Sequence, residues 1–299
     1  MKYITFKEEL VRILERKTGG RVDISKVEKN NGVTLEAVTI QTDPGLITPI
    51  IYLKGFYEEY EKGRTLEEIA GHIIRLGSGN TGEGLNWLAR NFSDYEAVRD
   101  NISYRLVNYE KNAGLLQNMP HRRFLDLAIV YQAVSFDKEA GTGSILINQE
   151  QAESWGVTEE TLNWLAQENT PKLFPAEVDS VGGILRRMGV ECGFSGEELE
   201  EIGGRGLPLY TLTNTHRYMG AVCILYPDIL QKISEIMKSD LFILPSSVHE
   251  TLILPDDGIH TVGELKEMVH EVNVTQVAEE EFLSDGVYRY ENGRGLQLM

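Results

Sequence analysis

The sequence predicts an α+β fold in which helices cover an antiparallel sheet. Three patterns carry this prediction: a strand–strand–helix–strand–strand order between Leu207 and Asp257, a hairpin signal near the N-terminus, and helix-start signals that recur along the chain. Strands that follow one another after short breaks pair antiparallel, and an amphipathic helix between them buries its apolar side on the sheet.

The central stretch contains four short runs rich in β-forming residues, at 210–213, 221–226, 241–244 and 251–254. Pro227 begins a helix between the second and third runs, because the first helical position needs no N–H donor. The apolar residues of that helix fall on one face: Ile229, Leu230, Ile233, Ile236 and Met237. Together with the helix that follows the fourth run, this order predicts a ββαββα core.

The N-terminal part is predicted to be a helix, a hairpin and further helices. Asn31-Gly32, a strong signal for a tight β-turn, joins strands expected at 21–27 and 33–40. The apolar segment 47–53 contains Pro49, so we expect an edge strand there, because proline donates no ladder hydrogen bond. Capping boxes, each a Thr or Ser with a Glu three residues later, open four helices: Thr5/Glu8, Thr65/Glu68, Ser93/Glu96 and Thr261/Glu264.

The middle of the chain contains a break and a strand pair. The helix that Ser93 opens is expected to run to about Tyr109, and a break follows at 118–120. One long strand is predicted over 124–136, a return strand over 141–147, and a loop-rich connection over 171–206. We therefore divide the chain into an N-terminal region, 1–117, and a C-terminal domain, 118–299.

Charge is the most unusual property of the chain. Asp and Glu number 46 against 29 Lys and Arg, a net charge of −17, and the last 44 residues hold ten acids and three bases. Direct nucleic-acid binding and binding to anionic membranes are not expected, because both need basic surfaces. An acidic surface keeps a protein in solution, and it also fits a basic protein partner or mimicry of nucleic acid.

Localisation and cofactors follow from what the sequence lacks. No apolar run reaches the length of about 20 residues that crosses a membrane, and the N-terminus has no signal-peptide pattern. Cys192 and Cys223 match no metal-binding spacing. We expect a cytoplasmic protein with reduced thiols, no metal and no cofactor.

Ser246, Ser247, His249 and Glu250 are the candidate catalytic residues, because they lie within five positions. A serine nucleophile needs a base within hydrogen-bond reach and a third group that orients the base. A turn in which Ser and His side chains bond the backbone is the competing interpretation, and we favour it. The glycine-rich stretch 77–84 lacks the Lys-Ser/Thr ending of a phosphate loop, and we interpret it as a connector.

The candidate binding residues lie near predicted strand ends: His121, Arg122, Asn214, His216 and Arg217. The basic pair beside His121 suits an anion or the acids of the protein itself, and the net charge favours an internal ion pair. Convergence of His121, His216 and His249 beside a carboxylate would make a metal or acid–base site.

Five stretches of the chain resemble a bacterial family of unknown function, the domain-of-unknown-function family numbered 5688. They are 33–40 with 49–60, RLVNYEKN at 105–112, PHRRFLDLAIVY at 120–131, LTNTHRYMGAVCILYP at 212–227 and SDLFILPSSVHETLILP at 239–255. The resemblance implies a bacterial, intracellular protein and no particular activity. A weaker similarity links 126–170 and 239–255 to the YtpQ-like proteins through Trp155, Leu162, Ala166 and Asn169.

Three functions remain open from the sequence. The first is a non-enzymatic binding or regulatory module with an acidic surface and a protein partner. The second is a hydrolase or metal-dependent enzyme that uses His249, His216, His121 and the Ser246-Ser247 turn. The third is an acidic mimic of nucleic acid.

Overall fold

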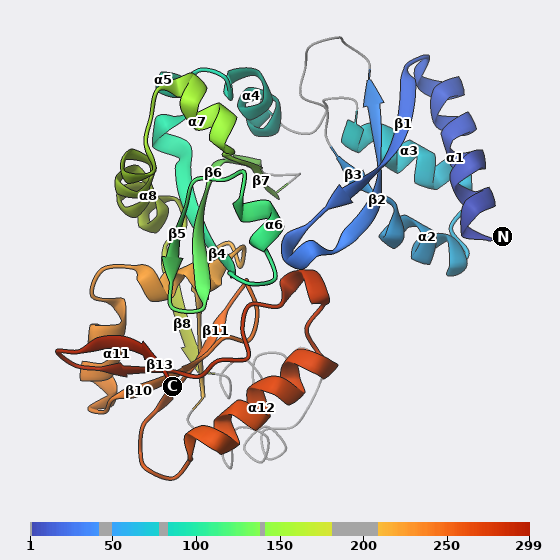
Figure 1. The fold of residues 1–299 in the computed structure, drawn as a ribbon. Coiled ribbons are helices and arrows are strands. Elements are labelled where there is room, and N and C mark those ends of the chain that lie inside the picture. The colour runs from blue at the N-terminus through green and yellow to red at the C-terminus, as the bar shows by residue number, and fades with distance from the viewer. Residues whose placement is uncertain (1, 42–49, 78–82, 138–140, 181–208) are drawn as a thin grey trace. The chain divides into compact units, whose positions relative to one another are not determined.

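The structure is a computed structural model that describes residues 2–41, 50–77, 83–137, 141–180 and 209–299 (Figure 1). The chain divides into two compact units: residues 1–101 with 133–145, and residues 102–132 with 146–299. Helices and sheets occur in both, so the predicted α+β class is confirmed. The boundary expected after residue 117 stays a prediction, because contact density does not test independent folding.

The first unit begins with the predicted helix, hairpin and helices. Helix α1 (Tyr3–Thr18) precedes β1 (Arg21–Glu28) and β2 (Thr34–Gln41), and β3 (Ile51–Tyr52), α2 (Leu53–Glu61) and α3 (Leu66–Gly77) follow. The sheet order β1-β2-β3 places β3 at an edge, as predicted. The hairpin turn uses Asn31 at φ 62° and Gly32 at φ 71°, the left-handed conformation that a tight turn requires.

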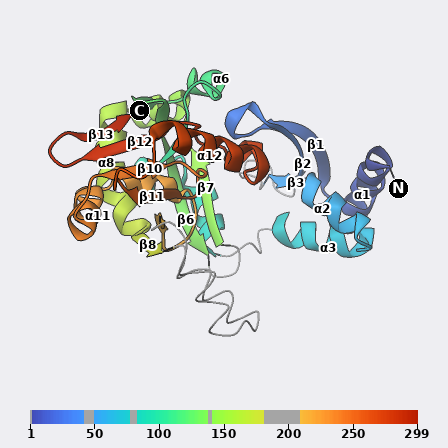
Figure 2. The same ribbon diagram turned by 90° about the horizontal axis from the view of Figure 1, so that it is seen from below.

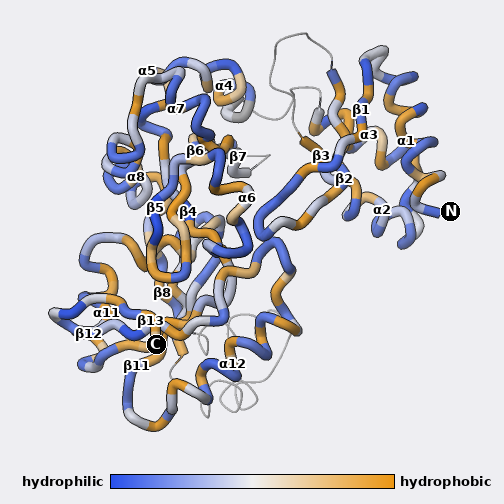
Figure 3. Tube along the Cα trace, viewed as in Figure 1, coloured by the Kyte–Doolittle hydropathy of each residue, from blue (hydrophilic) through white to orange (hydrophobic). Residues whose placement is uncertain are grey.

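The core of this unit lies between α1, α3 and the sheet. Phe6, Leu10 and Leu14 of α1 are fully buried against Val38 of β2 and Ile73 of α3. Hydrophilic and hydrophobic positions alternate along α1 in Figure 3, as expected of an amphipathic surface helix. The unit also contains α4 (Glu83–Asn91), α5 (Tyr95–Val98) and the short helix η2 (Arg99–Asn101).

Two of the four predicted capping boxes form. The N–H of Thr65 donates to Glu68 Oε2 at 3.0 Å and the N–H of Glu68 donates to Thr65 Oγ1 at 3.3 Å, and Thr261 and Glu264 form the same pair at the start of α12 (Val262–Thr275). The other two predictions are wrong. Helix α1 begins two residues before Thr5, and the carboxylate of Asp94 caps α5 in place of Ser93.

The helix predicted through Tyr109 is wrong, because β4 (Ile102–Asn108) is a strand. Val98, Ile102 and Leu106 fit helical spacing, yet nearly every residue of β4 is buried. A strand that is covered on both faces shows no alternation of polar and apolar residues. Its apolar run therefore cannot be distinguished from that of a buried helix.

The long strand predicted over 124–136 is confirmed as β6 (Leu127–Asp137), which begins three residues later than predicted; a short strand that was not predicted, β5 (His121–Phe124), precedes it. Leu125 adopts φ 56° and turns the chain between them. Strands β4, β6 and β5 form a sheet, and β7 (Gly141–Leu146) pairs with β6, close to its predicted range. A left-handed leucine has no sequence signal comparable to Asn-Gly, so the turn could not be predicted.

The second unit contains the largest sheet, six strands in the order β13-β12-β10-β11-β9-β8, with every pairing antiparallel. The strands are β8 (Ala176–Ser180), β9 (Tyr210–Asn214), β10 (Leu241–Leu244), β11 (Thr251–Pro255), β12 (Tyr288–Glu291) and β13 (Gly295–Leu298). Figure 2 shows α12 lying against β10 and β11, where Leu265 and Val269 pack on Phe242 and Leu254. This confirms the predicted antiparallel sheet covered by helices.

The second strand of the predicted ββαββα core is wrong. Residues Gly220–Leu225 form a 3-10 helix, η3, which leads into α11 (Ile229–Met237). Gly220 to Ile224 are all buried, and periodicity does not separate a short buried helix from a buried strand. The sequence also missed α7 (Gln149–Trp155), β8 and β13, and α8 (Glu159–Leu173) extends six residues beyond its predicted end.

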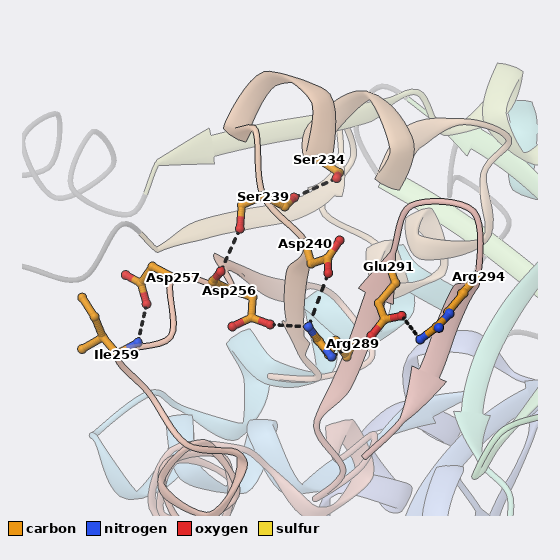
Figure 4. A network of polar contacts seen from close by, with 9 residues as sticks. All are labelled: Ser234, Ser239, Asp240, Asp256, Asp257, Ile259, Arg289, Glu291 and Arg294. Carbon is orange, nitrogen blue, oxygen red and sulfur yellow. Dashed lines mark hydrogen bonds and ion pairs between the residues drawn. The ribbon is translucent and has the colours of Figure 1, made fainter.

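Ion pairs of Arg289 connect three strands of the sheet (Figure 4). Its guanidinium lies 2.6 Å from Glu291, 2.8 Å from Asp256 and 3.3 Å from Asp240. Arg294 pairs with the second carboxylate oxygen of Glu291 at 2.8 Å. The network joins the start of β10, the end of β11 and the hairpin of β12 and β13.

Two further sequence features can be placed only in part. Residues 78–82 of the glycine-rich stretch and most of the stretch 171–206 lie outside the described residues. Among the described helices, none is long and apolar enough to cross a membrane.

Candidate functional site

Two loops of the second unit pack against each other, 214–220 after β9 and 245–250 before β11. Asn214 is fully buried and organises the first loop. Its Oδ1 accepts the N–H groups of His216 at 3.1 Å and Tyr218 at 3.3 Å, and its Nδ2 donates to the carbonyl of Tyr218 at 2.8 Å. The predicted binding residue Asn214 therefore holds the backbone, and it leaves His216 and Arg217 at the exposed tip of the loop.

The loop stores backbone strain. Arg217 and Met219 adopt φ of 51° and 50°, which side-chain-bearing residues rarely do. At Gly220 a Cβ atom would lie 2.2 Å from Thr213 Oγ1 and 2.4 Å from the carbonyl oxygen of His249, so only glycine fits. Such strain persists where the surroundings over-determine it, and it clusters at ligand-binding sites.

Ser247 and His249 are held by the backbone. The hydroxyl of Ser247 accepts the N–H of His249 at 3.0 Å. The ring Nδ1 of His249 accepts the N–H of Met219 at 3.3 Å, and Nε2 faces the Glu281 carboxylate at 3.7 Å. The tautomer with its proton on Nε2 follows from these partners.

This geometry does not pair a serine with the histidine. Both ring nitrogens of His249 face other groups, and a nucleophile–base pair needs one of them within hydrogen-bond reach of the hydroxyl. Ser246 is half-buried in the same turn, and in the described part of the chain no hydrogen bond joins it to the ring. Glu250 does not orient His249, because its side chain lines a separate depression.

That depression lies on one face of the large sheet and is shallow and open to solvent. Its lining comes from β8, β9 and both loops: Glu177, Asp179, Thr211, Thr213, Arg217 and Glu250. Glu177 pairs with Thr213 and Asp179 with Thr211 across the ladder, so the four side chains share a face.

Several polar groups of the depression have no partner. Among the described residues, neither Glu177 nor Glu250 forms an ion pair, and the guanidinium of Arg217 forms none either. Thr211 is 6% exposed; among the described residues its hydroxyl forms no hydrogen bond, and its oxygen is accessible to solvent. This oxygen can therefore accept a hydrogen bond from a donor group that enters the depression beside the carboxylates.

His121, Arg122 and Arg123 lie in β5, outside this site. Arg122 forms a two-point ion pair with Glu159 at 3.1 and 2.8 Å, which agrees with the internal ion pair that the net charge favoured. His121 Nδ1 lies 2.9 Å from the carbonyl of Met119, and Arg123 stacks 4.5 Å above the ring of Tyr109.

The three histidines do not form a metal site. His216 contacts the ring of Phe174 and His249 that of Tyr218, while His121 lies beside Tyr109. Within the described ranges, no group of three or more His, Cys, Asp or Glu side chains has a metal-binding arrangement.

Cys223 is a buried thiol, and burial raises its pKa to about 12. The unfolded thiol titrates near pH 9, so between pH 9 and 12 the unfolded state loses a proton that the folded state keeps. We expect the free energy of unfolding to fall in this window by up to about 1.4 kcal/mol per pH unit. Urea denaturation at pH 8, 9 and 10 should give a steeper fall for the wild type than for Cys223→Ala; equal slopes would contradict the assignment.

The sequence did not single out Glu177, Asp179, Thr211 or Thr213 as site residues. The segment 176–180 falls inside the stretch predicted as loop-rich, so no strand placed Glu177 and Asp179 on one face. The only sequence pattern that pointed to these residues was the alternation Thr211-Leu212-Thr213. On a strand it places both threonines on one face and the leucine on the other.

The described residues thus define a two-unit α+β protein with an acidic depression on its largest sheet. The chain belongs to the family of unknown function DUF5688, whose model matches residues 3–292. This confirms the resemblance seen in the sequence; the weaker similarity to the YtpQ-like proteins stays a prediction. No curated protein and no solved structure matches the chain.

Proposed function

We propose that this protein is a non-enzymatic binding module whose depression receives a cationic group of a basic partner protein. One observation carries the proposal: Glu177 and Glu250, which form no ion pair among the described residues, line a small depression together with Asp179, the solvent-accessible hydroxyl of Thr211 and a single guanidinium. A carboxylate that lacks a cation gains interaction energy when one arrives.

The size of the depression favours a compact cation. A lysine ammonium has three donors on a flexible stem and suits several acceptors at once. Glu177 and Glu250 supply carboxylates, and Thr211 supplies a hydroxyl oxygen. A bulkier ligand would have to leave most of its surface in solvent, since small-molecule sites are larger.

The charge of the whole chain supports the same partner. At −17 the protein attracts cations over a Debye length of about 8 Å in physiological salt, which raises the rate of encounter with a basic surface. The strained, tied loop 214–220 supplies rigidity, because a preorganised site loses less entropy on binding.

The hydrolase alternative lacks a comparable observation. Its serine and histidine face backbone groups and Glu281, so it would require both loops to rearrange. Turnover of an ester or peptide substrate that disappears in His249→Ala would contradict the binding proposal. Mimicry of nucleic acid would need carboxylates in a regular row, and Glu279 to Glu281 form only one short turn.

The test is a calorimetric titration of the full chain with a ten-residue peptide of alternating lysine and valine. We expect Glu177→Gln/Glu250→Gln to weaken binding about tenfold, equivalent to roughly 1.4 kcal/mol. The control Glu267→Gln/Glu271→Gln makes the same charge change on the exposed side of α12 and should weaken binding less than twofold. Equal losses in both double variants would mean nonspecific attraction and would overturn the proposal.

A further inference from the structure

We propose that the partner binds as an added strand along the free edge of β8, with lysines at alternate positions. This inference rests on the proposed function, and it names the form of the bound segment. In the part of the chain that the structure describes, β8 is the last strand of the six-stranded sheet and pairs with β9 alone. An open edge of this kind accepts an extended peptide through main-chain hydrogen bonds.

The hydrogen-bond pattern shows which backbone groups face outward. The N–H of Thr215 donates to the carbonyl of Pro175 at 2.9 Å, one step beyond the ladder of β8 and β9. Bonded and non-bonded pairs alternate in an antiparallel ladder, so Glu177 and Asp179 bond to β9. The N–H and C=O of Val178 therefore point away from β9, and no other described residue bonds to them.

The side chains of β8 divide between the two faces. Glu177 and Asp179 face the depression, and Val178 faces the opposite side with 38% of its surface exposed. An added strand places the residue opposite Val178 on the valine side and the residues before and after it on the carboxylate side. The structure thus selects a basic–apolar–basic alternation.

The spacing of such a segment matches the carboxylates. Alternate residues on a strand are about 6.6 Å apart, and Glu177 and Asp179 are themselves alternate residues of β8. Two lysines of the added strand would lie opposite these two acids. Glu250 lines the depression beyond Thr213, two strands further from the added strand than Glu177.

The charges on the edge also select against wrong partners. Open edges invite pairing with other chains, and proteins commonly protect them with charged side chains. The carboxylates of β8 would lie opposite each other if two copies of this chain paired, which is destabilising. A lysine-bearing strand turns the same carboxylates into favourable cross-strand pairs.

The test alters main-chain hydrogen bonding and leaves the charges unchanged. Val178→Pro removes the outward N–H, and an edge strand tolerates proline at such a position. We expect it to weaken binding of the alternating lysine–valine peptide at least tenfold, whereas Val178→Ala binds like the wild type. The melting temperatures of both variants should stay within a few degrees of the wild-type value.

A second measurement leaves the protein unchanged. In the peptide, N-methylation of the central valines removes donors that face β8 and should abolish binding, whereas N-methylation of the central lysines removes donors that face away and should be tolerated. Equal effects of the two methylated peptides, or wild-type binding by Val178→Pro, would overturn the added-strand inference. If Glu177→Gln/Glu250→Gln still weakens binding in that case, the proposed cation site survives; if it does not, both fail.

Discussion

Replacing Gly220 with alanine lowers the free energy of unfolding of the second unit by about 3 kcal/mol. The added Cβ would lie 2.2 Å from Thr213 Oγ1, 2.4 Å from the His249 carbonyl oxygen and 2.9 Å from the Asn214 nitrogen. Two of these atoms are backbone atoms, one at the end of β9 and one in the loop before β11, so the clash must separate the two loops. Overpacking of a rigid site costs roughly 1 to 3 kcal/mol, and more where backbone has to move.

Gly114 provides the matched control. It lies in α6 (Ala113–Leu116) of the same unit, and a Cβ added there meets nothing within 4 Å. Gly114→Ala should leave stability unchanged or raise it by up to about 1 kcal/mol, because alanine is the better helix former. Urea denaturation followed by circular dichroism measures both variants. Equal stability of the two would contradict the close packing of the loops.

Replacing Arg289 with alanine costs roughly 2 kcal/mol. The change leaves Asp240, Asp256 and Glu291 close together without the cation that separates them (Figure 4). Breaking a buried charge network costs about 3 to 5 kcal/mol, and Arg289 is 31% exposed, so solvent screening reduces the cost.

Arg294 is the control for this prediction. It pairs with Glu291 alone and is 73% exposed, and exposed ion pairs contribute about 0 to 1 kcal/mol. Arg294→Ala should therefore change the urea midpoint little. If Arg289→Ala is equally mild, the network does not hold the strands of the sheet together.

The sequence predicted turns and helix starts correctly where a few neighbouring residues determine the local backbone conformation. Asn31-Gly32 fixed its hairpin turn. Thr65/Glu68 and Thr261/Glu264 formed their capping boxes because each Thr immediately precedes the helix and each Glu is its third residue. The predictions failed where burial decides. Most residues of β4 and η3 are buried, and an apolar run of this kind fits a helix and a strand equally well.

Only the residues that the two loops contribute to the candidate site could be predicted from the sequence. Arg217 and Glu250 were identified from the sequence, and both line the depression. The remaining lining residues are brought there by the ladder of β8 with β9, which joins segments more than 30 positions apart. Long-range pairing of this kind leaves no periodicity within either segment. The sequence therefore contained no pattern that placed Glu177 and Thr211 next to each other.

The central claim, that the depression binds a lysine, is tested most directly by a double-mutant cycle between Glu250→Gln and a peptide whose binding lysines are replaced by norleucine. Each single change should weaken binding, and the combined change should weaken it by less than the sum. The expected coupling energy is roughly 1 kcal/mol, as for close charge pairs across an interface. Additive effects of the two changes would contradict the account, because they would place the lysines away from Glu250.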